Sequence, residues 1–284
     1  MTENKSRTPY GPIAIIAGAG RFPFHVAQEA KRQGYTVLAL GIRGWADAAL
    51  AGHVDGYEDV ALGQLGRLID RLKSLGVHHA ILAGQVTKEV LLDPRAAFDA
   101  EALGLLREAG GVSVPALLSA IAKHLARAGI ALLDSSAFLR ANLCPRGVLT
   151  ARRPSSAEEA DVAVGLEAAR AIAALDIGQT VVVKGRVIVA VEALEGTDAA
   201  IRRAHALVGG GLVVVKTARD NQDRRLDLPV IGTETIATLR ETEAACLAVE
   251  AEMTLLLDRA ALIRDADAAG LCVMGVAPPP ARAA

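Results

Sequence analysis

Residues 13–40 read IAIIAGAGRFPFHVAQEAKRQGYTVLAL, and they decide the fold of the first half of the chain. An apolar run, Ile13–Ala17, leads directly into a glycine turn. Phe24–Gln33 then has helical character and ends at Gly34, a residue that suits the left-handed conformation in which many helices end. The next apolar run is Tyr35–Leu40. A strand, a glycine turn, a helix and a second strand in this order predict the opening of a doubly wound α/β domain with a parallel sheet.

The alternation of strands and helices continues as far as residue 134. We expect further helices at Leu62–Leu75, Ala96–Ala109 and Leu117–Ala128, and further strands at Val77–Ala83 and Ile130–Asp134. Between Arg140 and Pro154 the regularity is lost, because prolines and a glycine interrupt it. The sequence therefore predicts two α/β domains: a Rossmann-like N-terminal domain over residues 1–140, a linker over 141–154, and a C-terminal domain over 155–284.

The second half opens with a helix and a β-hairpin. Ser156 and Glu159 have the spacing of a capping box, which predicts the start of a helix that ends near residue 175. Thr180–Val183 and Val187–Glu192 are β-rich and closely spaced, so they predict a tight hairpin. Because hairpin strands are antiparallel, we expect the sheet of this domain to be mixed. The later elements that we expect are a helix at Ala199–Leu207 with Thr197 as its N-cap, a strand at Leu212–Val215, a helix at Glu234–Ala248, a strand at Met253–Leu257, a helix at Arg259–Ala269 and a strand at Leu271–Val276.

Composition and charge limit the class of protein. Of the 284 residues, 52% are hydrophobic but only 3% are aromatic, so aliphatic side chains must build the cores. The 31 basic and 32 acidic residues leave a net charge of −1, and we expect no nucleic-acid partner. Apolar stretches fall short of the roughly 20 residues that span a bilayer, and no signal peptide is recognisable, so we expect a cytoplasmic protein. The three cysteines fit no zinc or redox spacing.

The glycine turn after the first strand has the residues of an anion-binding turn. Gly18 and Gly20 would let the backbone approach a ligand, and the helix beyond Arg21 offers free N–H groups. Pro23 stands where a dinucleotide fingerprint would continue towards its third glycine, so nicotinamide binding is disfavoured. A tight strand-to-helix turn without a ligand is the alternative.

A second turn, Gly84-Gln85, follows another predicted strand. In a parallel sheet this turn shares an edge with the first, and ligands collect at that edge. Gln85 and Lys88 could contact the same ligand, although a purely structural turn explains the glycine equally well.

Acidic and basic side chains gather at strand ends and in loops between residues 176 and 232. The acids are Glu192, Glu195, Asp198, Asp223 and Asp227, and the bases are Lys184, Lys216, Arg224 and Arg225. Carboxylates suit Mg²⁺ or another divalent cation such as Mn²⁺, and basic side chains neutralise phosphate. The expected metal ligands are Glu195, Asp198 and Asp227, and the expected substrate contacts in this half are Lys184, Thr197, Lys216, Gln222 and Arg225. A solvated loop with salt bridges is the alternative.

Asp227 has apolar neighbours, in the run Leu226-Asp227-Leu228-Pro229. This context predicts a partly buried carboxylate, which would need a partner, a metal or a function.

These motifs resemble those of the LpxI family of UDP-2,3-diacylglucosamine pyrophosphatases. The resemblance covers almost the whole chain, from IAIIAGAGRFP at 13–23 through LAGQV at 82–86 to LCVMGV at 271–276. Its most specific parts are EGTD at 195–198 and NQDRRLDLPVIG at 221–232. The chain departs from the family pattern in a longer polar lead before the first strand.

The resemblance implies hydrolysis of the diphosphate of UDP-2,3-diacylglucosamine to UMP and 2,3-diacylglucosamine 1-phosphate (lipid X), a step of lipid A biosynthesis. It implies two α/β domains with the substrate held between them, dependence on a divalent cation, and a homodimer. The essential aspartate would be Asp227, with Asp198 and Asp223 as the next catalytic candidates. A diacylated substrate would also bring a cytoplasmic enzyme into peripheral contact with the inner membrane.

Without the resemblance, the residues are also compatible with two other functions. One is a non-catalytic nucleotide-binding regulatory module that uses the glycine turn but not the acidic loop. The other is a nicotinamide-dependent oxidoreductase, which Pro23 disfavours.

Overall fold

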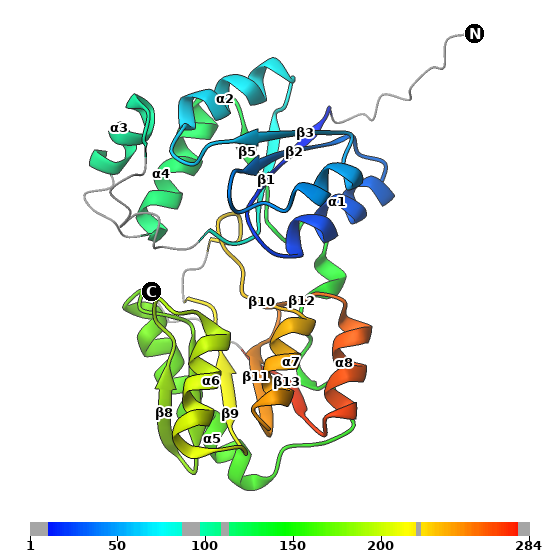
Figure 1. Ribbon diagram of the computed structural model, residues 1–284, viewed down its shortest axis with the longest axis vertical. Helices are drawn as coiled ribbons and strands as arrows, with labels where there is room; N and C mark the ends of the chain where they lie inside the picture. The colour runs from blue at the N-terminus through cyan, green and yellow to red at the C-terminus, as the bar shows by residue number, and fades with distance from the viewer. Residues whose placement is uncertain (1–10, 87–96, 109–113, 220–222, 278–284) are drawn as a thin grey trace. The chain divides into compact units, whose positions relative to one another are not determined.

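A computed structural model of the chain describes residues 11–86, 97–108, 114–219 and 223–277. Contacts divide the chain into two compact units (Figure 1). Unit 1 is the chain as far as Leu139 together with Asp223–Asp227, and unit 2 is Arg140–Gln222 together with the chain from Leu228 onward. Unit 1 is therefore not continuous in sequence, because a short turn from the second half of the chain belongs to it.

Unit 1 contains a five-stranded parallel sheet, as the sequence predicts. In spatial order its strands are β3 (Gly56–Val60), β2 (Val37–Ile42), β1 (Ile13–Ala17), β4 (His79–Ala83) and β5 (Ala131–Leu132). Its α-helices are α1 (Phe22–Arg32), α2 (Leu65–Ser74), α3 (Ala100–Glu108) and α4 (Val114–Arg127), and a 3₁₀ helix, η1, spans Ala48–His53. Strand β3 was not predicted, because its sequence, GYEDV, is acidic and half-exposed at the sheet edge.

Both faces of this sheet are covered by helices (Figure 1). Alternate residues of β1, Ala14 and Ile16, share one core cluster with Leu72 of α2 and Leu125 of α4. Helix α1 packs against β1, β2 and β4 from the other face. This arrangement explains why β1 is buried along its whole length and has no polar position.

Unit 2 contains a mixed six-stranded sheet, which confirms the predicted class. Its spatial order is β6 (Gly147–Val148), β13 (Cys272–Val276), β11 (Cys246–Glu250), β9 (Val213–Lys216), β7 (Thr180–Lys184) and β8 (Val187–Val191). Strands β13, β11 and β9 are parallel, whereas β7 is antiparallel to both of its neighbours. A separate parallel pair joins β10 (Val230–Ile231) to β12 (Leu255–Leu256).

Helices again cover both faces. Helix α5 (Ser156–Ala174) packs on one face, and α6 (Thr197–Val208), α7 (Thr233–Glu241) and α8 (Arg259–Ala268) pack on the other. A 3₁₀ helix, η3, spans Arg140–Asn142. Residues 141–154, which we expected to form a linker, lie in unit 2, where β6 pairs with β13 and the Val273 N–H donates to the Thr150 hydroxyl (2.9 Å).

The predicted hairpin is confirmed, with Gly185 and Arg186 both at positive φ as a type I′ turn requires. Asp161 of α5 is 5% exposed and accepts hydrogen bonds from the N–H groups of both turn residues. The capping box of α5 lies one residue earlier than predicted, on Ser155 and Glu158.

The prediction of one helix over Glu234–Ala248 was wrong. Helix α7 ends at Glu241, and Cys246–Glu250 forms the central strand β11. A strand buried on both faces has no alternation of polar and apolar residues, so its pattern does not separate it from a buried helix. The strand predicted over Met253–Leu257 is reduced to Leu255–Leu256.

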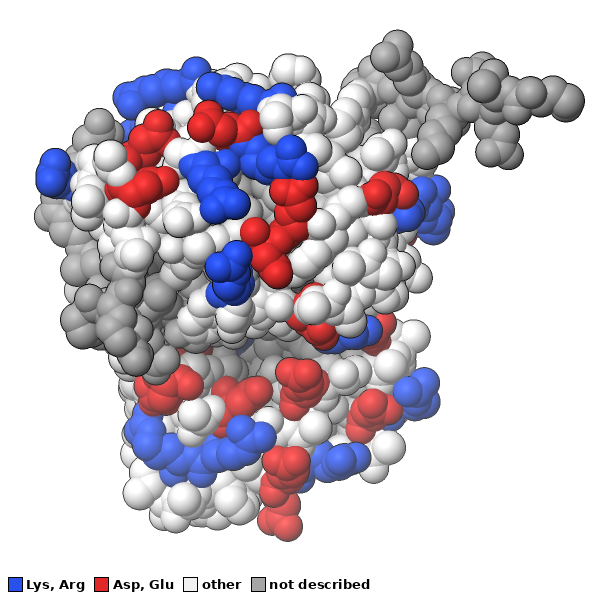
Figure 2. All heavy atoms as spheres, turned by 45° about the horizontal axis from the view of Figure 1, so that its top comes forward, with Lys and Arg blue, Asp and Glu red and all other residues white. Residues whose placement is uncertain are grey.

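The surface carries charges of both signs. On the face shown in Figure 2, basic and acidic side chains are interspersed, in keeping with ion pairs such as Lys31–Asp55 and Arg71–Glu58. Among the described residues, no helix has both the length and the apolar composition needed to cross a membrane.

Candidate active site

Two glycine turns at the carboxyl edge of the unit 1 sheet are hydrogen-bonded to each other. Ala19 and Gln85 exchange backbone hydrogen bonds of 2.8 and 2.9 Å. A Cβ atom on Gly18 would lie 2.6 Å from the Gln85 carbonyl oxygen, and one on Gly84 would lie 2.7 Å from the Ala19 carbonyl oxygen. Backbone packing between the turns therefore requires both glycines, with or without a ligand.

Gly20 and Arg21 have a different environment. Gly20 has φ +90°, and a Cβ atom there would meet no heavy atom within 4 Å. Arg21 is exposed, provides no side-chain cap for α1, and lies 4.6 Å from the centre of the Phe24 ring. The start of α1 thus combines an open glycine, a cation and backbone N–H groups, which is the local chemistry that binds anions.

The strand order of unit 1 places these turns at a topological switch point. β1 lies between β2 and β4, and the two turns follow β1 and β4. In doubly wound sheets the crevice at the carboxyl ends of such strands is where ligands bind.

The turn Asp223–Asp227 is held at the same sheet edge. The N–H of Ser135, just beyond β5, donates to the carbonyl oxygen of Arg224 (2.8 Å). Leu226 packs against the core of unit 1, and its N–H donates to the Asp223 carbonyl oxygen (2.9 Å). A segment that the sequence places in the second half therefore completes the edge of the first unit.

The two acids of this turn differ. Asp223 binds Arg225 through both carboxylate oxygens, at 2.6 and 2.9 Å, and this contact holds the pKa of Asp223 below its usual range. Asp227 is exposed, so the prediction that it is partly buried was wrong. The apolar residues Leu228 and Pro229 are buried, whereas the side chain of Asp227 is exposed.

Unit 2 carries a cluster of four polar residues, which we call the Lys216 cluster: Thr180, Glu192, Thr197 and Lys216. The Lys216 ammonium donates to the Thr197 hydroxyl (2.7 Å), which donates to Glu192 Oε1 (2.9 Å). The hydroxyl oxygens of Thr180 and Thr197 are 3.3 Å apart. The four residues meet because Thr180 is the register partner of Lys216, while β8 leads into Glu192 and α6 begins at Thr197.

The charges of this cluster are coupled. Burial acts to raise the pKa of Glu192, but the Lys216 charge and hydrogen bonds from Thr180, Thr197 and the Gln179 N–H outweigh it and hold the pKa below its usual range. Glu192 is therefore ionised at neutral pH. Within the described residues, the only hydrogen-bond acceptor of the Lys216 ammonium is Thr197, so two of its three N–H donors can serve an anionic ligand.

The EGTD element forms the start of α6. Thr197 is the first helical residue rather than the N-cap, which is Gly196, so this prediction was wrong and the Thr197 hydroxyl serves the Lys216 cluster instead. Asp198 has a buried Oδ1 atom without a hydrogen-bond partner among the described residues. The Glu195 carboxylate accepts from Arg203 (2.6 Å) and from the Ala193 N–H (3.0 Å).

Lys184 is not brought to the Lys216 cluster. Its ammonium donates to the carbonyl oxygen of Val208 (2.7 Å) at the end of α6, whereas Thr197 begins the same helix. Gln222 and Lys88, two other expected contacts, lie outside the described residues.

Three or more His, Cys, Asp or Glu side chains in a group that could hold a metal ion are not found in the part of the chain that the structure describes. Mg²⁺ is commonly held by one or two carboxylates, with water and substrate phosphate supplying the remaining oxygens. Asp198 fits such a role because of its unpartnered Oδ1 atom. Glu195 fits it less well, because Arg203 occupies its carboxylate.

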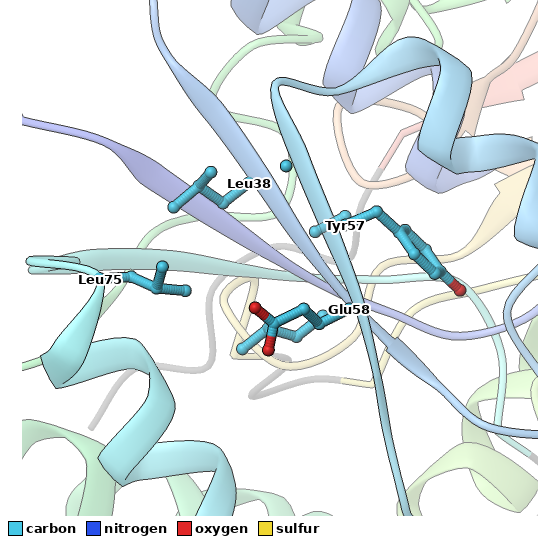
Figure 3. Close-up of a pocket in the computed structure, with 7 residues that line it drawn as sticks. Leu38, Tyr57, Glu58 and Leu75 are labelled. Carbon is cyan, nitrogen blue, oxygen red and sulfur yellow. The ribbon is translucent and has the colours of Figure 1, made fainter.

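A hollow of about 140 Å³ in unit 1 has no candidate residue in its lining. Figure 3 shows Leu38, Tyr57, Glu58 and Leu75 around it. A ligand pocket for a drug-sized molecule typically has a volume of roughly 300 Å³ or more, so this hollow does not suit a nucleotide-linked lipid.

Local sequence patterns did not show which residues meet at the carboxyl edge of each sheet. It took Glu192 as one acid among several and did not select Thr180, because their contacts depend on the register of the hairpin. It also passed over Asp134-Ser135-Ser136, although three polar residues directly after a strand carry the same positional signal as Gly84-Gln85.

Comparisons with known proteins support one family. A solved structure of "glycinamide-RNase-transformylase T" from Mycobacterium tuberculosis is 15% identical over 62% of this chain and 42% of that one, with a TM-score of 0.24, a likeness that carries no inference. UDP-2,3-diacylglucosamine pyrophosphatase LpxI of Caulobacter vibrioides is 32% identical over 280 residues, which cover 94% of this chain and 98% of that protein. Residues 12–141 match the LpxI N-terminal domain, and residues 145–274 match the LpxI C-terminal domain. The chain therefore belongs to the LpxI family.

Proposed function

We propose that the protein hydrolyses the diphosphate of UDP-2,3-diacylglucosamine to UMP and 2,3-diacylglucosamine 1-phosphate, and so acts in lipid A biosynthesis. The observation that carries this proposal is the near full-length match to a protein with that activity in its name. The chemistry of the two sheet edges supports it, because a diphosphate needs cations and N–H donors for its oxygens and a carboxylate for the attacking water.

The edge of unit 1 would supply the reacting carboxylate. Asp227 is exposed on a turn that is fixed to the sheet edge, so a substrate can reach it without unfolding the turn. In this position a carboxylate can orient a water molecule and accept its proton as the water attacks phosphorus. Gly20, Arg21 and the start of α1 would bind phosphate oxygens at the same edge, with Gln85 and Arg225 as further contacts.

The edge of unit 2 would bind phosphate through the Lys216 cluster. Thr197 and ionised Glu192 hold the Lys216 ammonium in place, which reduces the entropy that the lysine side chain loses when it binds an anion. The N-terminus of α6 adds a partial positive charge beside it.

A divalent cation, Mg²⁺ or Mn²⁺, would shield the charge of the diphosphate oxygens when bound. Asp198 is the residue that we propose to hold it, with Asp227 as the alternative.

The activity is tested by incubating the purified full-length protein with UDP-2,3-diacylglucosamine and measuring UMP. We expect UMP with Mg²⁺, its loss with EDTA, and its return when excess Mg²⁺ is added. UMP formation that EDTA leaves unchanged would contradict the metal requirement alone. Binding of the substrate without any UMP would contradict the hydrolase and favour a nucleotide-binding regulatory module.

We also propose a homodimer that forms through unit 2. Strand β8 ends the sheet and exposes Val187 (63%) and Ile188 (45%), and Leu207 near the end of α6 is 65% exposed. An apolar edge strand without a charge in its sequence readily pairs with another strand. Light scattering should give twice the monomer mass, and Ile188→Lys should halve it; a monomer at micromolar concentration would contradict the proposal.

The location that fits this substrate is the cytoplasm, with peripheral contact at the inner membrane. We expect the protein to sediment with vesicles that contain the diacylated substrate. Sedimentation that is no greater than with plain phospholipid vesicles would contradict specific recruitment by the lipid.

A further inference from the structure

Three polar residues shortly after β5, Asp134-Ser135-Ser136, are bound to the turn that carries Asp227. Ser135 is 2% exposed, and its N–H donates to the Arg224 carbonyl oxygen (2.8 Å). Its hydroxyl lies 3.2 Å from the Leu82 carbonyl oxygen and 3.3 Å from the Arg225 carbonyl oxygen. Ser135 therefore joins the end of β4 to a turn that lies 90 residues after the serine itself.

Asp134 and Ser136 hold the side chain of Arg224. Asp134 Oδ1 accepts from the N–H (2.7 Å) and the hydroxyl (2.6 Å) of Ser136. Asp134 Oδ2 lies 3.2 Å from Arg224 Nε, an ion pair without a hydrogen bond. Arg224 Nη2 donates to the Ser136 hydroxyl (3.0 Å). The guanidinium is thus fixed at two points.

Anchored and exposed residues alternate along the turn. Arg224 is bound to Asp134 and Ser136, and Leu226 packs into the core of unit 1, whereas Arg225 and Asp227 are exposed. On the other side of Asp227, Leu228 is 5% exposed and begins the part of the chain that belongs to unit 2. The side chain of Asp227 is thus exposed, although the turn that carries it is anchored through the half-buried Leu226.

We infer that Asp134, Ser135 and Ser136 are positioning residues that fix the carboxylate of Asp227 for catalysis. The inference rests on the proposed function, because it takes Asp227 as the reacting carboxylate. A displacement of about 1 Å in a reacting group can lower turnover on the order of 100-fold. Partly exposed ion pairs contribute little to stability, so loss of the Arg224 contact should leave the protein folded.

The test compares Asp134→Asn, Arg224→Ala and Arg224→Lys with a control, Glu58→Gln, in the full-length protein. The control also breaks an ion pair in unit 1, that of Glu58 with Arg71, but both of these residues are distant in sequence from the turn. Two readouts are used: hydrogen–deuterium exchange of the peptide that contains 223–228, and kcat and KM for UDP-2,3-diacylglucosamine.

We expect Asp134→Asn and Arg224→Ala to speed exchange in this peptide and to lower kcat about 10- to 100-fold, with KM little changed. Arg224→Lys should restore part of kcat, because an ammonium can pair with Asp134 but lacks the planar fork that also reaches Ser136. The control should change neither readout. A role confined to stability would lower the melting temperature and leave kcat of the folded enzyme intact.

Exchange that stays at the wild-type rate in both variants would show that Asp134 and Arg224 do not hold the turn, and this conclusion would not depend on the measured activity. Faster exchange with an unchanged kcat would overturn the positioning role. If the wild-type protein releases no UMP, the proposed function fails and the positioning role fails with it, while the exchange data still decide whether these residues hold the turn.

Discussion

The carboxyl edges of the two sheets present acids in opposite ways. In unit 1, Asp227 is exposed on a turn whose neighbouring residues are anchored. In unit 2, Glu192 is half-buried and bound to the Thr197 hydroxyl, and the Lys216 charge compensates its own. A partly buried carboxylate needs partners such as the Lys216 ammonium, whereas an exposed carboxylate lies where water and substrate can reach it. We therefore propose that Asp227 at the first edge acts on the attacking water, and that Lys216 at the second edge binds phosphate together with the start of α1 at the first.

The largest effect should follow from removing the exposed acid. Asp227→Ala should lower kcat by on the order of 100-fold or more, because a group that acts in the transition state is lost. Since the side chain is exposed, the melting temperature should stay close to that of the wild type. Steady-state kinetics and thermal unfolding of the same preparation check both parts. An early-melting variant that retains near wild-type kcat would make Asp227 a structural residue and move the catalytic role to Asp198 or Asp223.

Removing the cation of the second edge should act on binding. A hydrogen bond to a charged group contributes about 1.5–3 kcal/mol, so Lys216→Ala should lower kcat/KM about 10- to 100-fold. Lys184→Ala is the matched control, because the Lys184 ammonium binds the C-terminal end of α6 and not the Lys216 cluster. A similar loss in both variants, measured by substrate titration, would contradict the proposal that Lys216, and not Lys184, binds the phosphate.

The contribution of Glu192 to the stability of unit 2 should depend on pH. Its folded pKa is depressed, so its contribution to stability is present above the unfolded pKa of about 4.3 and is lost as pH falls through the lower folded value. The melting temperature of the wild type should exceed that of Glu192→Gln at neutral pH, and the difference should shrink below about pH 4.3. A difference that is constant from pH 7 to acid would show that the charge of Glu192 has no part in it.

The smallest effects concern the paired glycine turns of unit 1. Gly18→Ala places a Cβ atom against a backbone oxygen and should cost about 1–3 kcal/mol in the free energy of unfolding. Gly20→Ala has open space but a positive φ, and should cost about 1 kcal/mol. Urea denaturation compares the two variants. An equal or larger loss for Gly20→Ala would mean that close packing of the turns does not constrain Gly18.

Strong local patterns made much of the fold predictable. The strand, glycine turn and helix at residues 13–32 and the hairpin at 180–191 were located from apolar runs and turn residues, because these signals are local. Edge strand β3 and central strand β11 were missed for opposite reasons. The first is too polar for an apolar pattern, and the second is buried on both faces and has no alternation.

The candidate site was less predictable, because it depends on contacts distant in sequence. Thr197 and Lys216 were selected one by one, but the chain from Lys216 through Thr197 to Glu192 needs the strand register. The apolar neighbours of Asp227 suggested a partly buried acid, yet Leu228 and Pro229 are buried and Leu226 is half-buried while Asp227 is exposed. No local pattern shows that residues 223–227 belong to unit 1, since that depends on Ser135 and Leu226.

The most direct test of the central claim is the stoichiometry of the products released from UDP-2,3-diacylglucosamine by the purified wild-type protein. We predict one UMP for each 2,3-diacylglucosamine 1-phosphate, because the bond that breaks lies within the diphosphate. Release of UDP with a sugar that carries no phosphate, or no product at all with Mg²⁺ present, would contradict the account.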